Sequence, residues 1–110
     1  MGNKDPGSTL KKIRENVIEN DSYSVEVKII YCMIVAFSMS RGYCWLSNST
    51  ISRTLDMSIG KVSEILGLLE DENLIVISKK GQSRKLWIFE EYQEEREEIT
   101  KKLHQNKSVN

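Results

Sequence analysis

A chain of 110 residues suffices for one small domain with a modest core, and its 16 basic and 16 acidic residues cancel to a formal charge of zero. The overall charge therefore gives no evidence for or against a nucleic-acid partner. One histidine and two cysteines without CxxC spacing argue against a zinc site or a catalytic thiol, and we expect no metal, no cofactor and no enzyme activity. The longest apolar run, residues 29–37, is too short to span a bilayer, and the first residues lack a signal sequence, so we expect a cytoplasmic protein.

The N-terminal part predicts a short lead followed by an amphipathic helix. Residues 1–8 are interpreted as a flexible lead. From residue 9 to residue 19, apolar residues recur at i, i+3, i+7 and i+8, which places them on one helical face. These residues are Leu10, Ile13, Val17 and Ile18.

A second helix is predicted from Ser24, which can act as its N-cap, to about Met39. This segment is apolar on nearly all sides, which indicates burial on several faces. Its β-branched residues also permit a strand, but the segment is long for one. A helix this apolar in a small domain is also suited to a subunit interface.

Residues 46–75 predict two capped helices that are separated by a tight turn. Ser47 and Ser58 can each accept a hydrogen bond from an otherwise unpaired N–H of a first helical turn. Each cap is flanked by an apolar pair with the spacing of a hydrophobic staple: Leu46 with Ile51, and Met57 with Val62. Asn73 can take the left-handed position that ends the second helix. Together these signals predict a helix-turn-helix.

The regions on either side of this unit predict β-structure and a last helix. Residues 43–46 suggest a short strand, and runs at 74–78 and 85–89 around a loop centred on Gly81 predict a hairpin. The short strand can pair with this hairpin in a three-stranded sheet. The fold class is therefore mainly α with a small β-hairpin or three-stranded sheet, a winged helix-turn-helix, over residues 9–89.

The C-terminal segment predicts a charged helix over residues 90–105 and a tail at 106–110. The apolar stripe of this helix, Tyr92, Ile99 and Leu103, is too short for a convincing coiled coil. It favours packing against the same domain or a sister subunit. Trp45 and Trp87 are expected to close the core, and stacking on unpaired bases is the alternative.

The second helix of the pair divides into a core face and an exposed face. A step of 100° per residue assigns to the core Ile59, Val62, Ile65, Leu66 and Leu69. Lys61, on the opposite side, stands near the positive end of the helix dipole, which disfavours a cation and suggests a role outside the helix. Gly60 permits a DNA strand to approach closely. Gly67 and Leu68 lie deeper, where they suit a protein contact, and we interpret them as a dimer interface.

The other cationic or polar positions that suit a DNA backbone lie in the hairpin and in the first helix of the pair. The hairpin loop offers Lys79, Lys80, Gln82 and Arg84, which can follow phosphates or place Arg84 in a minor groove. Ser49 and Arg53 can touch backbone phosphate. A solvated charged loop without a ligand is the alternative interpretation.

The run SNSTISRTLDMSIGKVSEILGLLEDENLI resembles the winged-helix branch of helix-turn-helix DNA-binding proteins. In that family the second helix of the pair reads the major groove and the hairpin contacts the flanking groove. The resemblance implies positions near bases for Ser58, Gly60, Lys61, Ser63 and Glu64. The acidic Glu64, Glu70, Asp71 and Glu72 depart from a strongly basic recognition helix.

Two groups within this family are similar in size and in their leading and trailing helices. One is the TubR-type centromere-binding adaptors of plasmid partition systems, whose dimers join through their recognition helices and whose partner is a filament-forming tubulin-like GTPase. The other comprises small replication-control proteins and repressors of plasmids and phages. The resemblance thus implies a homodimer that binds double-stranded DNA, with partition favoured and transcriptional or replication control as the alternative. A winged-helix protein-interaction module is the hypothesis of another class.

Overall fold

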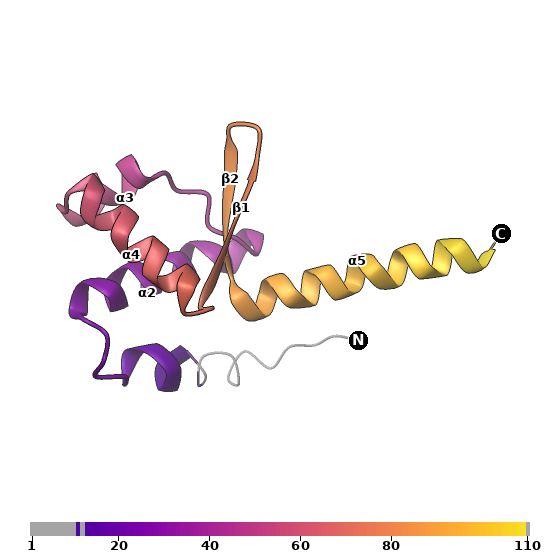
Figure 1. The fold of residues 1–110 in the computed structure, drawn as a ribbon, viewed down its shortest axis with the longest axis horizontal. Coiled ribbons are helices and arrows are strands. Elements are labelled where there is room, and N and C mark those ends of the chain that lie inside the picture. The colour runs from indigo at the N-terminus through magenta and orange to yellow at the C-terminus, as the bar shows by residue number, and fades with distance from the viewer. Residues whose placement is uncertain (1–10, 12, 110) are drawn as a thin grey trace.

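The computed structural model describes residue 11 and residues 13–109, and it has the mainly helical architecture with a two-stranded antiparallel hairpin that the sequence predicts (Figure 1). The elements in chain order are η1 (Arg14–Ile18), α2 (Val25–Arg41), α3 (Asn48–Leu55), α4 (Ile59–Asp71), β1 (Ile75–Lys80), β2 (Ser83–Ile88) and α5 (Phe89–Val109). This is the arrangement of a winged helix-turn-helix, which confirms the predicted fold class. In the described part of the chain, no helix is both long and apolar enough to span a bilayer.

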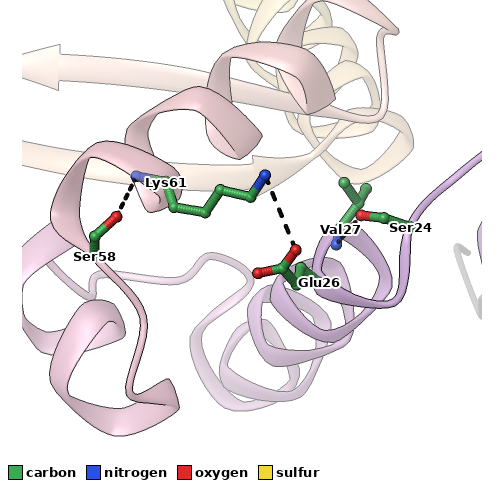
Figure 2. Close-up of polar contacts among 5 residues, drawn as sticks. All are labelled: Ser24, Glu26, Val27, Ser58 and Lys61. Carbon is green, nitrogen blue, oxygen red and sulfur yellow. Dashed lines mark hydrogen bonds and ion pairs between the residues drawn. The ribbon is translucent and has the colours of Figure 1, made fainter.

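The core lies where α2, α4 and the inner face of the hairpin meet. Its fully buried side chains come from elements far apart in sequence, among them Ile34 of α2, Leu69 of α4 and Leu86 of β2. Ser24 caps α2 as predicted, because its hydroxyl accepts a hydrogen bond from the Val27 N–H at 3.3 Å (Figure 2).

The first predicted helix is present in part, and its predicted apolar face is only partly correct. Residues Arg14–Ile18 form a short π-helix, and Leu10 lies outside the described residues. Ile13 and Val17 are buried, but Ile18 is 43% exposed. Consecutive side chains of a helix point in different directions, and the core covers the side of Val17 but not that of Ile18.

The predicted third strand is reduced to one bridge. Cys44 exchanges both backbone hydrogen bonds with Leu86, each at 2.8 Å, and no further pairing of residues 43–46 with the hairpin occurs. The physical reason is that the next carbonyl in line, that of Leu46, accepts a bond from the side chain of Arg84. The sheet therefore has two strands.

The hairpin and the last helix are longer than predicted. β1 and β2 include most of the residues that the sequence assigned to a loop, and only residues 81–82 turn between the strands. Gly81 has φ +63°, a conformation that favours glycine. α5 runs on through residue 109, so residues 106–109 are helical and not a tail.

α5 packs on its own domain only at its base. The ring of Tyr92 meets that of Trp87 edge-on at 5.7 Å. Farther along, Ile99 is 51% and Leu103 57% exposed, and the helix extends away from the rest of the fold (Figure 1). The stripe therefore packs on its own domain only at Tyr92, and packing of Ile99 and Leu103 against a sister subunit stays a prediction.

Candidate nucleic-acid interface

Local hydrogen bonds hold α3 and α4 at a fixed turn. The Ser47 hydroxyl accepts from the Thr50 N–H and the Ser58 hydroxyl accepts from the Lys61 N–H, each at 3.1 Å, so both predicted N-caps are confirmed. Asp56 has φ 53°, and the hydroxyl of Ser52 donates to the carbonyl of Met57 across the turn.

The end of α4 sets the direction of the hairpin. Asn73 has φ 59°, and its N–H donates to the Glu70 carbonyl at 3.0 Å. The Leu74 N–H donates to the Leu69 carbonyl at 2.9 Å, which completes a Schellman motif. The predicted stop at Asn73 is therefore confirmed, and the chain enters β1 immediately afterwards.

The exposed side of α4 is nearly as predicted. Val62, Ile65, Leu66 and Leu69 are buried, whereas Ile59 is 54% exposed, so its assignment to the core was wrong. Ile59 is the first residue of α4, and it precedes the turn that packs on the core. The exposed side carries Gly60, Ser63, Glu64 and Leu68, with Gly67 partly exposed.

The two glycines of α4 have no packing role within the described chain. A Cβ at Gly60 or at Gly67 would meet no atom within 4 Å. Each glycine costs helix stability of about 1 kcal/mol relative to alanine. Their presence is consistent with a close approach by another molecule.

The side chain of Lys61 forms an ion pair with a residue of α2 in the free protein. Its ammonium is 3.9 Å from the carboxylate of Glu26, which belongs to the first turn of α2, as Figure 2 shows. Both side chains are well exposed, 39% for Lys61 and 50% for Glu26. An exposed ion pair contributes only about 0–1 kcal/mol, so Lys61 can leave Glu26 at small cost.

The strand register separates the cations of the hairpin onto two faces. Lys79 lies opposite Arg84, and Lys80 lies opposite Ser83. Because side chains alternate across a strand, Lys79 and Arg84 share the face that carries the buried Leu86, whereas Lys80 points to the other face. The hairpin therefore does not present all its predicted contacts on one side.

Arg84 is bound within the domain. Its guanidinium donates to the carbonyl of Leu46 at 2.6 Å and is partly buried. Burial lowers the pKa of Arg84 from its ordinary value, and the neighbouring Cys44 acts in the opposite sense. Arg84, which the sequence suggested for a DNA minor groove, thus joins the hairpin to Leu46.

Two adjoining clefts lie between the helix-turn-helix and the hairpin. The first has a volume of about 460 Å³ and is lined by Trp45, Ser47, Asn48, Lys79, Gly81, Gln82 and Arg84. The second, of about 520 Å³, is lined by Asn48, Ser63, Leu66, Gly67, Glu70, Ile77, Lys79 and Arg84. The structure thus brings together Lys79, Gln82, Arg84 and Ser63, whereas Ser49 and Arg53 lie exposed on α3 without lining either cleft.

Sequence reasoning missed Asn48 in this region and placed Trp45 in the core. Asn48 lines both clefts, and its amide oxygen is buried with no hydrogen-bond partner in the described part of the chain. Its position directly after the cap Ser47, in the first turn of a helix, is the sequence signal that could have identified it. Trp45 was expected in the core but is 40% exposed, with Arg41 stacked at 4.4 Å from its ring centre.

Residues 24–75 match the model of a protein family described as a helix-turn-helix domain. The match spans α2, α3 and α4 and ends at the first residue of β1, so it supports a helix-turn-helix unit and, with it, sequence-specific DNA binding. No curated protein and no solved structure gives a significant match.

Proposed function

We propose that this helix-turn-helix chain binds double-stranded DNA sequence-specifically and is not an enzyme. One observation supports the proposal: the amino terminus of α3, the side of α4 that carries Ser63 and Gly67, and the Lys79 face of the hairpin line two adjoining clefts. In this docking, α4 enters the major groove by its amino-terminal turn and the hairpin follows the backbone beside it.

The phosphate contacts come from both sides of the first cleft. Lys79 and Gln82 reach the backbone from the hairpin, and Asn48 offers its amide from the first turn of α3. That turn also carries N–H groups and the positive end of a helix dipole, which favour an anion. The affinity rests on such contacts, so it falls steeply as the salt concentration rises.

The base contacts come from the exposed side of α4. Ser63 and Glu64 are exposed there, and a carboxylate accepts from the amino group of cytosine, whereas a hydroxyl suits several bases. Gly60 lets the duplex approach the helix backbone. Lys61 exchanges Glu26 for a phosphate or a guanine on binding.

Fluorescence anisotropy with a cognate duplex and a random duplex tests these roles. Lys79→Ala should weaken both complexes alike and reduce the slope of log affinity against log salt by about 0.9. Lys61→Ala should weaken the cognate complex more than the random one. Lys101→Ala removes an exposed cation from α5 and serves as the matched control, with no change expected. Equal losses in all three variants would contradict the division into backbone and base contacts.

The biological role proposed with this activity is that of a homodimeric adaptor at repeated or palindromic sites of a plasmid or phage partition system. The similarity in size and in flanking helices supports it, and a filament-forming GTPase is then the protein partner. Repression of transcription or control of replication is the alternative. Co-sedimentation of the DNA complex with such a GTPase, encoded by a neighbouring gene, would separate partition from the two alternatives.

A protein-interaction module is the rival function of another class, and the exposed Ile99 and Leu103 of α5 favour it. The two classes give opposite results in one gel-shift experiment at low salt. A folded protein that retards no duplex from its own locus would support the interaction module and reject DNA binding.

A further inference from the structure

An exposed apolar face runs along the whole of α2. Val25 is 70% exposed, Ile29 43% and Met39 76%, and the smaller Cys32 and Ala36 between them are exposed as well. On a helix, these five positions fall within about 80° of one another. Their spacing of 4, 3, 4 and 3 residues is typical of a helix that packs along another helix.

The rest of α2 is already used by the fold. Its opposite side, which includes Ile30 and Ile34, is fully buried in the core. The five residues of the exposed face are therefore not needed for packing within their own domain. None of them carries a charge that would suit a phosphate. Residues 1–10 contain only two large apolar residues, Met1 and Leu10, which are too few to match the five positions.

The helix dipole of α2 favours a partner helix of the opposite direction. The end charges are already engaged elsewhere, since Glu26 pairs with Lys61 of α4 and Arg41 stacks on Trp45. A second α2 that runs antiparallel sets opposite ends of the two helix dipoles side by side. A parallel pair would instead bring like ends of the dipoles together.

We infer that this α2 face is a two-fold interface with a second copy of this chain, in which two α2 helices pack antiparallel and cross near Cys32. Cys32 is the middle position of the face, and the small side chains of Cys32 and Ala36 allow the helices to approach to about 8–10 Å. This interface is the contact that joins the homodimer of the proposed function, and the inference rests on that function. Formation of the interface does not require DNA.

The area of this contact limits its strength. α2 has 17 residues and is about 25 Å long, so packing along most of it buries on the order of 1,000 Å² in the two copies together. That is near the lower limit of specific interfaces, about 1,000–1,200 Å². The dimer should therefore dissociate in the micromolar range, and two copies on adjacent DNA sites would associate more strongly than free copies.

The α2 face also fits a dimer better than the Gly67 and Leu68 surface that the sequence suggested. Gly67 lines the cleft that faces the hairpin, and Leu68, at 39% exposure, is the one large apolar residue left on that part of α4. A single side chain offers little apolar area, whereas α2 offers a continuous strip.

Cross-linking of the full chain tests the position of the interface. A short bis-maleimide should join two chains through Cys32 at protein concentrations of tens of micromolar, because a crossing at this residue brings the two thiols within its reach. Cys44 is fully buried and provides an internal control, and Cys32→Ser should abolish the product. A monomer up to several hundred micromolar in analytical ultracentrifugation would overturn the inference.

A charge-exchange series tests the antiparallel direction. Val25→Glu and Met39→Lys each place one charge in the interface and should each raise the dissociation constant at least tenfold. Both substituted sites are highly exposed and each charge suits its end of the helix dipole, so the variants should fold, as circular dichroism will verify. The double variant should regain the dimer, since each new carboxylate then faces a new ammonium of the other copy.

The control for the rival interface is Leu68→Glu, which should leave the dimer intact. Loss of the dimer in Leu68→Glu with no effect of Val25→Glu would overturn the inference in favour of α4. No recovery in the double variant would reject the antiparallel arrangement. Anisotropy with a duplex that carries a single site separates these outcomes from DNA binding itself, because a monomer that still binds this duplex leaves the proposed function in place.

Discussion

Replacement of Arg84 by methionine tests whether this residue anchors the hairpin or contacts DNA. Methionine keeps an unbranched side chain but removes the guanidinium that donates to the Leu46 carbonyl at 2.6 Å. Hydrogen bonds that involve a charged group contribute about 1.5–3 kcal/mol, and the partial exposure of Arg84 points to the lower end of that range. We therefore expect a loss of about 1.5 kcal/mol in the free energy of unfolding, or roughly 5–10 °C in Tm.

Lys79→Met is the matched control, because Lys79 lies directly across the hairpin from Arg84 and the change in net charge is the same. Lys79 is exposed, so its replacement should change the free energy of unfolding by less than about 0.5 kcal/mol. Urea titration followed by tryptophan fluorescence measures both variants. If Arg84→Met unfolds at the wild-type midpoint and loses DNA affinity and salt dependence as Lys79→Met does, then Arg84 is a phosphate contact and the anchoring role is refuted.

Two further predictions concern the cap of α4 and the buried thiol. Ser58→Ala should lower the free energy of unfolding by about 1 kcal/mol through loss of the cap, whereas Ser58→Asp should keep the stability but weaken DNA binding; equal DNA affinity of Ser58→Asp and wild type would place this helix end away from the duplex. Burial raises the pKa of Cys44, so the unfolded chain ionises first, and stability that is complete at neutral pH is lost as the pH rises past about 9. Urea midpoints measured from pH 7 to pH 10 should fall more steeply for the wild type than for Cys44→Ala, and parallel curves would contradict the burial argument.

The features that the sequence predicted correctly depend on neighbours within a few residues. Ser24, Ser47 and Ser58 cap helices because a hydroxyl reaches an N–H three positions away in any chain that turns there. Asn73 ends α4 for the same kind of reason, since a left-handed residue permits the two closing backbone bonds. The helix-turn-helix and the existence of the hairpin were therefore predictable.

The features that the sequence did not predict depend on contacts between distant residues. The bond from Arg84 to Leu46 joins positions 38 residues apart, and it both ends the third strand and removes one cation from the predicted DNA surface. Likewise, Ile59 has the helical phase of a core residue, but it stands one turn ahead of the elements that cover Val62. Local periodicity contains no information about where a neighbouring element ends.

By itself the sequence determined the N-caps, the turn between α3 and α4 and the end of α4, because each follows from hydrogen bonds that a short stretch of chain can satisfy alone. The tertiary structure decided which side chains are available to a partner. It paired Lys61 with Glu26, separated Lys79 from Lys80, and left the Val25 to Met39 face of α2 uncovered. Exposure depends on which elements pack together in space, and the apolar pattern of α2 is equally compatible with a helix that is buried on every side.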